Sequence, residues 1–153
     1  MIVPAEGTFR LDREADTARL GAAMGRELQR HEAICLSGPL GAGKSTLARG
    51  LIRALAGADV EAPSPTFTLV QTYETRAFPV AHFDLYRLES ADEAFELGFD
   101  EALDDGAAIV EWAEKLGHHL PLDRLDVALS FDGVRRRAWL TPHGAWEARA
   151  LEF

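Results

Sequence analysis

Hydrophobic residues along this chain follow two periods, and the change from one period to the other predicts its strands and helices. Apolar runs at Ala33–Ser37 and Ala107–Glu111 are typical of buried strands. Apolar residues at helical spacing cover residues 15–28, for which Asp12 is the expected N-cap, and residues 46–56. The pattern therefore predicts a chain in which strands and helices alternate.

The remaining segments carry mainly strand signals. Further strands are predicted at residues 8–11, 68–73, 78–84, 124–131 and 136–141. A turn at Arg76 and Ala77 is expected to join two of them as an antiparallel hairpin. A short helix is predicted over residues 91–97 with Ser90 as its N-cap, and residues 144–153 fit either a strand or a helix.

Several of the predicted strands are followed by helices, and several end in acids. This order favours an α/β fold. Strand–helix–strand order gives parallel pairing with helices over the sheet, whereas hairpins add antiparallel strands. We therefore predict a three-layer α/β fold with a mixed, mainly parallel central sheet. A length of 153 residues, 47% of them hydrophobic, suits one such unit with a substantial core, so residues 1–153 are expected to form a single domain.

Composition restricts the partners and the compartment. The net charge of −9, from 25 acids against 16 basic residues, should repel a phosphate backbone and anionic lipid, so any role with nucleic acid is expected to pass through a partner protein. Cys35 is the only cysteine, which excludes an internal disulfide and a thiolate metal cluster. No basic leader or long apolar stretch is visible, so we expect a cytoplasmic protein without membrane contact.

One stretch carries a specific chemical signature. Residues 38–45 read Gly-Pro-Leu-Gly-Ala-Gly-Lys-Ser and match the phosphate-binding pattern G-x-x-x-x-G-K-[ST], between a predicted strand and a predicted helix. Glycines let the backbone N–H groups wrap a phosphate, Lys44 can reach the β- and γ-phosphates, and the Ser45 hydroxyl can bind Mg²⁺. A simple turn would not require Lys44 and Ser45 at these offsets. The predicted nucleotide-binding residues are Gly38, Gly41, Ala42, Gly43, Lys44, Ser45 and Thr46, and they indicate a P-loop NTPase.

Two acids and a threonine lie where such a site needs them. Glu111 ends a predicted strand and is expected to hold Mg²⁺ opposite Ser45, although it could be an ordinary solvated acid. Asp84 also ends a strand and could orient or deprotonate the attacking water, or cap the turn that follows. Thr66 lies between Pro65 and Phe67, after the predicted helix of residues 46–56. It is a candidate sensor of the γ-phosphate, and the alternative is that this segment is only a rigid proline turn.

Other conspicuous residues give weaker indications. His82 lies beside Asp84 without the further ligands that a metal site requires. Trp112 could stack on a ligand, dock a partner or pack in the core. The basic run of residues 135–137 could meet a phosphate, an acidic partner surface or RNA, but alternation along a strand would separate Arg136 from its neighbours.

The motifs taken together resemble one known family. Residues 38–46 are followed by Ser-Pro-Thr-Phe-Thr-Leu-Val at 64–70, by His-Phe-Asp-Leu-Tyr-Arg-Leu at 82–88 and by Val-Glu-Trp at 110–112. A P-loop alone occurs in many families, but this succession resembles the TsaE (YjeE) family, the small bacterial ATPases of tRNA threonylcarbamoyladenosine synthesis.

The resemblance implies a function and partners. Such a protein would bind ATP with Mg²⁺ and hydrolyse it slowly alone. It would act with the TsaD and TsaB subunits, which install threonylcarbamoyl on A37 of tRNAs that read ANN codons, so tRNA would be met only through the complex. Hydrolysis would then reset the transferase complex between turnovers.

The resemblance also implies residue roles. Lys44 would contact phosphate and Ser45 the metal, Thr66 would belong to a switch-like loop, Asp84 would support hydrolysis, and Glu111 would join the Mg²⁺ shell. These are the expected catalytic and metal-binding residues.

The match to the family is weaker at both ends of the chain. Thr17 matches a threonine near the family's first helix and is expected near adenine. The tail after Thr141 is poorly matched. Within the phosphate-loop motif, Ser45 stands where many members of the family have threonine, although either hydroxyl can bind the metal.

Two other functions are compatible with a P-loop of this size. In a nucleotide-gated binding module, hydrolysis would only time the release of a partner. A small-molecule kinase usually brings arginines on a lid over the phosphates, and the chain has none between Glu89 and Asp105, which disfavours that reading.

Overall fold

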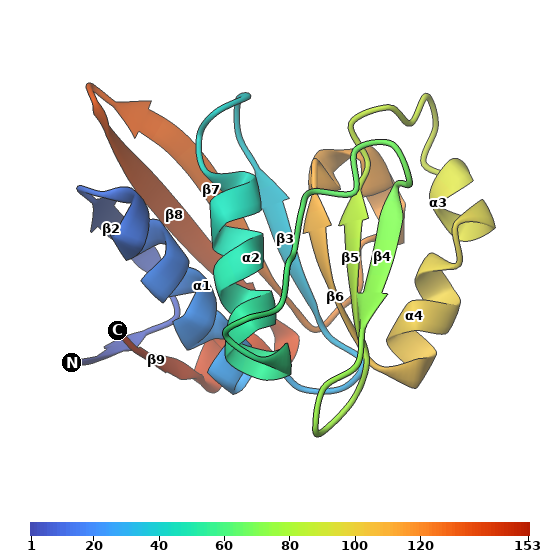
Figure 1. Cartoon of the computed structure of the whole chain (residues 1–153), viewed down its shortest axis with the longest axis horizontal. Helices are drawn as coiled ribbons and strands as arrows, with labels where there is room; N and C mark the ends of the chain where they lie inside the picture. Colours follow the sequence, from blue (N-terminus) through green and yellow to red (C-terminus); the bar gives the residue numbers. More distant parts are fainter.

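The computed structural model describes all 153 residues and is organised around a seven-stranded sheet with the strand order β2-β8-β7-β3-β6-β5-β4 (Figure 1). The strands are β2 (Gly7–Leu11), β3 (Ala33–Ser37), β4 (Val70–Tyr73), β5 (Val80–Asp84), β6 (Ala107–Glu111), β7 (Arg124–Asp132) and β8 (Arg135–His143). Every strand predicted from the sequence is therefore present, with small shifts at the ends.

The sheet is mixed, as predicted, but its parallel part is confined to the centre. Strands β7, β3, β6 and β5 run parallel, whereas β8 and β2 on one side and β4 on the other pair in antiparallel fashion. The prediction of mainly parallel pairing thus holds only for the central strands, because the two hairpins reverse the chain at both edges.

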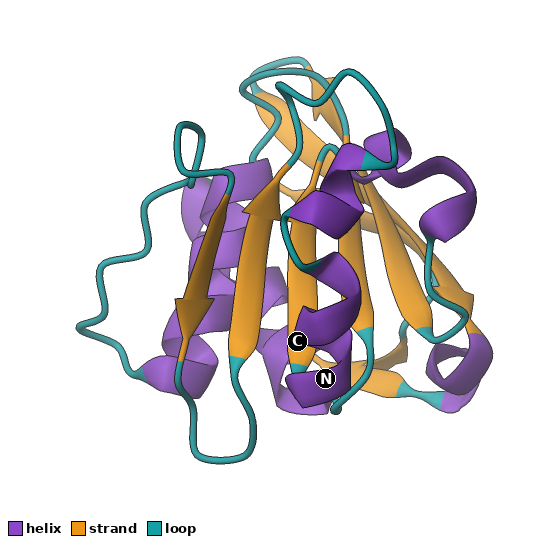
Figure 2. Cartoon of the chain, turned by 90° about the vertical axis from the view of Figure 1, so that its right-hand side faces the viewer, coloured by secondary structure: helices purple, strands orange, loops and turns teal.

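Helices lie on both faces of the parallel strands (Figures 1 and 2). The helical elements are α1 (Glu14–Glu27), α2 (Lys44–Ala56), α3 (Glu93–Glu96), α4 (Phe99–Asp105) and the 3-10 segments η1 (Ala113–His119) and η2 (Gly144–Ala148). Alternate residues of β3 join two separate cores. Ile34 packs in the core that includes α1 and α2, and Cys35 packs in the core that includes α4 and η1. Burial raises the pKa of the Cys35 thiol, consistent with an inert core residue.

The tail that the sequence left open combines a 3-10 segment with a strand. After η2, strand β9 (Ala150–Glu152) pairs with β1 (Ile2–Pro4) in a small antiparallel sheet, which brings the two termini together (Figure 1). No helix in the structure combines the length and apolarity needed to span a membrane.

Two predicted helix starts are corrected by the structure. Helix α1 begins after Arg13, not Asp12, because the Arg13 N–H donates to Asp16 Oδ2 at 3.1 Å while Asp12 pairs with Arg135 instead. Helix α3 has Asp92 rather than Ser90 at its N-cap, and it is shorter than expected. Helix α2 starts at Lys44, so the phosphate-loop motif continues directly into the helix.

Helices α1 and α2 cross closely because glycines face the partner backbone. A Cβ on Gly21 would lie 2.1 Å from the carbonyl oxygen of Leu47, and one on Gly50 would lie 2.3 Å from that of Ala18. This contact fixes α1 against the helix that starts at the phosphate loop.

Gly21→Ala should therefore destabilise the protein, although alanine is the better helix former. Intrinsic propensity alone would stabilise it by about 1 kcal/mol, but the clash with the Leu47 carbonyl should lower the free energy of unfolding by about 1–3 kcal/mol. Urea denaturation would measure this, with Ala15→Ser at an exposed position of α1 as the control. A gain in stability would contradict the close crossing.

Candidate functional site

The loop of residues 38–43 joins the end of β3 to the start of α2 and turns on three glycines. Gly38, Gly41 and Gly43 have φ of 133°, 81° and 109°, which favours glycine. A Cβ on Gly38 would also lie 2.3 Å from the carbonyl oxygen of Leu129. No side chain caps the N-terminus of α2, so its first N–H groups remain available to an anion.

Lys44 is folded back onto its own loop. Its ammonium donates to the carbonyl oxygens of Gly38 at 2.6 Å and Pro39 at 2.9 Å, and lies 4.2 Å from the centre of the Trp112 ring. Burial lowers the pKa of Lys44, and the negative charges of Glu111 and its neighbours oppose this effect. The ammonium is thus shielded from water at the place where a phosphate would be neutralised.

Trp112 covers this ammonium from an unusual backbone position. Its φ of 60° is rare for a residue other than glycine, and its ring lies 4.8 Å from that of Tyr86. Trp112 is half-buried. It therefore contacts the lysine of the phosphate loop on one side and also packs against the edge of the core that includes α4 and η1.

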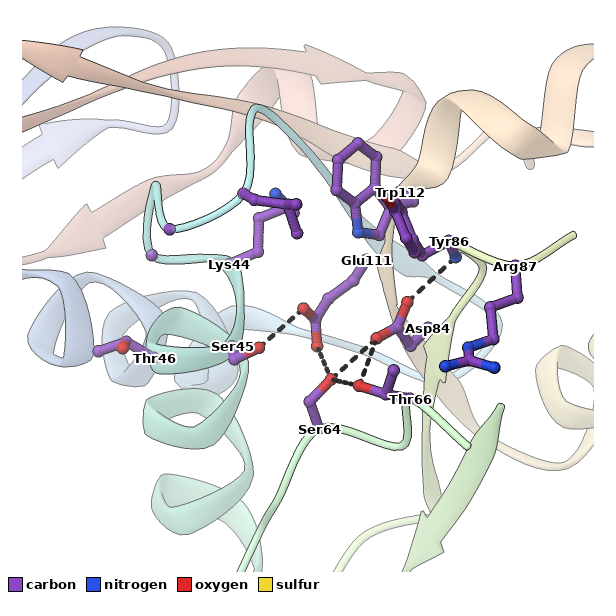
Figure 3. Close-up of a pocket in the computed structure, with 13 residues that line it drawn as sticks. Lys44, Ser45, Thr46, Ser64, Thr66, Asp84, Tyr86, Arg87, Glu111 and Trp112 are labelled. Atoms are coloured by element: carbon purple, nitrogen blue, oxygen red, sulfur yellow. Dashed lines mark hydrogen bonds between the residues drawn. The ribbon is translucent and has the colours of Figure 1, made fainter. Parts of the chain in front are cut away.

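Asp84 and Glu111 end the neighbouring parallel strands β5 and β6 and are direct register partners. Both carboxylates are buried. The Ser45 hydroxyl, in the first turn of α2, donates to Glu111 Oε1 at 2.9 Å (Figure 3). A hydroxyl and a carboxylate oxygen therefore converge beside the phosphate loop, an oxygen donor set of the kind that Mg²⁺ prefers.

The loop after α2 closes over the two carboxylates. The Ser64 hydroxyl lies 2.9 Å from Asp84 Oδ2 and 3.2 Å from Glu111 Oε2, while the Thr66 hydroxyl lies 3.3 Å from Asp84 Oδ2 (Figure 3). Asp84 Oδ1 accepts the backbone N–H of Tyr86 at 3.1 Å. Asp84 thus caps the following turn, as one of its two interpretations predicted, and also holds the loop, while its role toward an attacking water stays a prediction.

His82 holds the second oxygen of Glu111. Its Nε2 lies 2.6 Å from Glu111 Oε2, and the imidazole is completely buried. Burial alone would raise the pKa of the Glu111 carboxyl, but hydrogen bonds from His82, Ser45 and Ser64 outweigh it and keep this pKa below the usual value. Glu111 is therefore held ionised and in one orientation.

The residues of the site line a pocket of about 360 Å³. Its lining comprises Leu40, Gly41, Gly43, Lys44, Ser45, Thr46, Ser64, Thr66, Asp84, Tyr86, Arg87, Glu111 and Trp112. A second pocket of about 360 Å³ shares Gly41, Gly43 and Thr46 and is completed by the start of α1 and residues 134–136. The two pockets lie on either side of the same loop. No group of three or more His, Cys, Asp and Glu side chains is arranged to hold a metal ion.

Most of the site residues predicted from the sequence meet in these pockets. Lys44, Ser45, Thr66, Asp84 and Glu111 line the first pocket together. Their chemical roles stay predictions.

The other predicted residues have different positions. Thr17 is buried in the second pocket, where its methyl group would lie 3.3 Å from a Cβ on Gly43. Gly38 and Ala42 belong to the phosphate loop but line neither pocket.

Several contributors to the site escaped the sequence analysis. Ser64, Tyr86 and Arg87 line the first pocket, and His82 supports Glu111. A period of two along β5 would have placed His82 on the same face as Asp84, but its contact with Glu111 depends on the register with β6.

The basic run on β8 is only partly divided, although alternation predicted that Arg136 would be separated from both neighbours. Arg136 lines the second pocket and donates to the carbonyl oxygen of Gly41 at 3.2 Å. Arg135 and Arg137 pair instead with Asp12 and Asp132. Arg135 also lines the second pocket beside Arg136, so only Arg137 is separated from that pocket.

Comparison with known proteins identifies the family. The family model described as "Threonylcarbamoyl adenosine biosynthesis protein TsaE" matches residues 11–138. The tRNA threonylcarbamoyladenosine biosynthesis protein TsaE of Rickettsia felis is 40% identical over 143 residues, covering 94% of this chain and 84% of the relative. The protein of the same name from Mycobacterium tuberculosis is 42% identical over 147 residues, covering 87% of this chain and 86% of the relative.

A solved structure agrees with this assignment. The crystal structure of Bacillus subtilis YdiB superposes with a TM-score of 0.72 at 26% identity, covering 94% of this chain and 88% of that one. The resemblance that the motifs indicated is thus confirmed over most of the sequence. The chain belongs to the TsaE family of tRNA threonylcarbamoyladenosine biosynthesis proteins.

Proposed function

We propose that this protein is a Mg²⁺-dependent ATPase with a three-layer P-loop NTPase fold. It would act in the cytoplasm with the TsaD–TsaB transferase complex in the modification of A37 in tRNAs that read ANN codons. The observation that carries the proposal is the convergence of Ser45 and Glu111 at 2.9 Å beside the phosphate loop and its buried Lys44. This combination of hydroxyl, carboxylate and ammonium is suited to a metal-bound triphosphate.

The residues present fit a magnesium ion. Ser45 Oγ and Glu111 Oε1 would hold it, and phosphate oxygens and water would complete its shell, which is how Mg²⁺ usually binds. When bound, the ion would neutralise charge on the phosphates.

Hydrolysis by this site would use the groups around Asp84. A water oxygen would form a bond to the γ-phosphorus, and the bond from that phosphorus to the β–γ bridging oxygen would break, leaving its electron pair on ADP. The proton of the water would pass to Asp84. Thr66, whose hydroxyl lies 3.3 Å from Asp84, would respond to the γ-phosphate.

One observation favours a nucleotide-gated binding module as the second candidate. Asp84 Oδ1 accepts the Tyr86 N–H, and Oδ2 lies within hydrogen-bond distance of the Ser64 and Thr66 hydroxyls. A site in this arrangement can hold nucleotide while hydroxyl groups of the Ser64–Thr66 loop occupy the Oδ2 side of Asp84. Hydrolysis would then depend on a rearrangement of the Ser64–Thr66 loop.

The test is ATP turnover by the purified chain, alone and with TsaD, TsaB and tRNA. We expect turnover that the partners stimulate and that Asp84→Ala abolishes, while Asp59→Ala, at an exposed position, leaves it unchanged. Tight Mg²⁺-dependent binding without turnover in any combination would favour the binding module. Absence of ATP binding would refute both candidates.

A further inference from the structure

Arg87 is the only arginine that lines the pocket with Lys44, and its side chain has no polar partner. It makes no hydrogen bond or ion pair within the chain. Its guanidinium carbon lies 4.7 Å from the centre of the Phe67 ring, which is 82% exposed, on the same loop as Thr66. Figure 3 shows the guanidinium on the side of the pocket formed by Thr66 and Asp84.

The backbone that carries Arg87 is held by hydrogen bonds, in contrast to its side chain. The Leu85 N–H donates to the carbonyl oxygen of Glu111 at 3.1 Å, and the Leu88 N–H donates to that of Leu85 at 3.0 Å. Leu85 and Leu88 are buried, and Asp84 accepts the Tyr86 N–H. Arg87 is thus a cation without a polar partner, carried by a hydrogen-bonded turn at the edge of the candidate site.

Neutralising the charge of a transferring phosphoryl group in this pocket would require a cation besides Lys44. Its lining has two carboxylates, Asp84 and Glu111, and besides Lys44 only Arg87 is positive. As the γ-phosphoryl group transfers, negative charge is spread over its outer oxygens, and P-loop enzymes commonly neutralise it with an arginine supplied in cis or in trans. A guanidinium can donate two parallel hydrogen bonds to such oxygens, whereas an exposed contact with an aromatic ring is weak.

We propose that Arg87 is the cation, supplied by this chain itself, that leaves Phe67 and binds the γ-phosphoryl group in the transition state of ATP hydrolysis. The proposal rests on the proposed ATPase function. It assigns to Arg87 a role in the transition state, distinct from the binding of ground-state nucleotide by Lys44 and the phosphate loop.

Aluminium fluoride with ADP tests this proposal, because it mimics the transferring phosphoryl group. ADP affinity with Mg²⁺ would be measured by calorimetry, with and without aluminium fluoride. In the wild type we expect aluminium fluoride to tighten ADP binding. In Arg87→Ala the tightening should be lost while ADP alone binds within about threefold of the wild type, and turnover with TsaD and TsaB should fall about 10³-fold.

Two further variants sharpen the test. Arg87→Lys keeps the charge but loses the paired donors, so it should restore only part of the tightening. Arg76→Ala removes an exposed arginine from the β4–β5 turn, outside the pocket, and should behave as the wild type.

Three results would overturn the proposal. First, aluminium fluoride could still tighten ADP binding in Arg87→Ala. If this variant lost only the stimulation of turnover by TsaD and TsaB, Arg87 would be a docking residue. Wild-type protein could bind ADP with no tightening at all, which would exclude a cation supplied in cis while leaving nucleotide binding intact. Failure of the wild type to bind any nucleotide would instead refute the proposed function on which this inference depends.

Discussion

Lys44→Ala should weaken the binding of ATP at least about a hundredfold, since the proposed charge-assisted hydrogen bonds to phosphate would be lost. In the structure the Lys44 ammonium bonds to the carbonyl oxygens of Gly38 and Pro39 and is nearly excluded from water. Phosphate oxygens would take over these bonds, and the buried position would strengthen them. Calorimetric titration with Mg²⁺ and ATP measures the change.

The chain offers a matched control for this variant. Lys115, its other lysine, also donates to a carbonyl oxygen, that of Leu88 at 3.0 Å, but it does not line the pocket. Lys115→Ala should therefore bind ATP like the wild type, and circular dichroism should show both variants folded. Undiminished affinity in Lys44→Ala would remove the phosphate loop from the site.

Periodicity predicted the elements of the fold better than their edges. The continuous apolar run along β3 was sufficient to predict a strand buried on both faces, and Ile34 and Cys35 do pack into different cores. The N-cap of α1 was missed because Asp12 is a favoured N-cap residue type, whereas the helix begins after Arg13. Asp12 pairs with Arg10 and Arg135 instead. The pairing with Arg135 is a tertiary contact that a local helix-start rule does not contain.

The candidate site was predictable where a local rule applied to it. A fixed spacing identified Lys44 and Ser45, and the rule that ligands bind beyond the carboxyl ends of parallel strands selected Glu111. Contacts between segments distant in sequence were not predictable. Ser64 reaches Glu111 only because of the path of its loop, and His82 does so only because of the β5–β6 register.

These unpredicted contacts determine the ionisation and the orientation of the Glu111 carboxylate. A buried carboxylate with no partners would tend to bind a proton, because burial disfavours its charge. Three donors, from Ser45, Ser64 and His82, keep it ionised and leave its orientation fixed. The supports of Glu111 therefore matter as much to the proposed metal site as the acid that the sequence identified.

Glu111→Gln should abolish most Mg²⁺-dependent hydrolysis while sparing the binding of ATP in the absence of Mg²⁺. Glutamine has the same shape but no charge, and its amide nitrogen cannot accept a hydrogen bond, so one of the three donors loses its acceptor. We expect turnover to fall about a hundredfold or more, the order found when a group that stabilises developing charge is removed. ATP binding without Mg²⁺ should change by less than about threefold, since the phosphate loop and Lys44 remain.

A titration of turnover and of ATP affinity against Mg²⁺ concentration separates this expectation from a general loss of structure. If Glu111 holds the ion, the variant should lose the gain in ATP affinity that Mg²⁺ gives the wild type, and more Mg²⁺ should restore part of its activity. Glu74→Gln removes the same charge from an exposed residue that does not line the pocket, and should leave both curves unchanged. Should Glu111→Gln keep the wild-type response to Mg²⁺, the ion would have to be bound without this carboxylate, and the three donors around it would serve only to stabilise the end of β6.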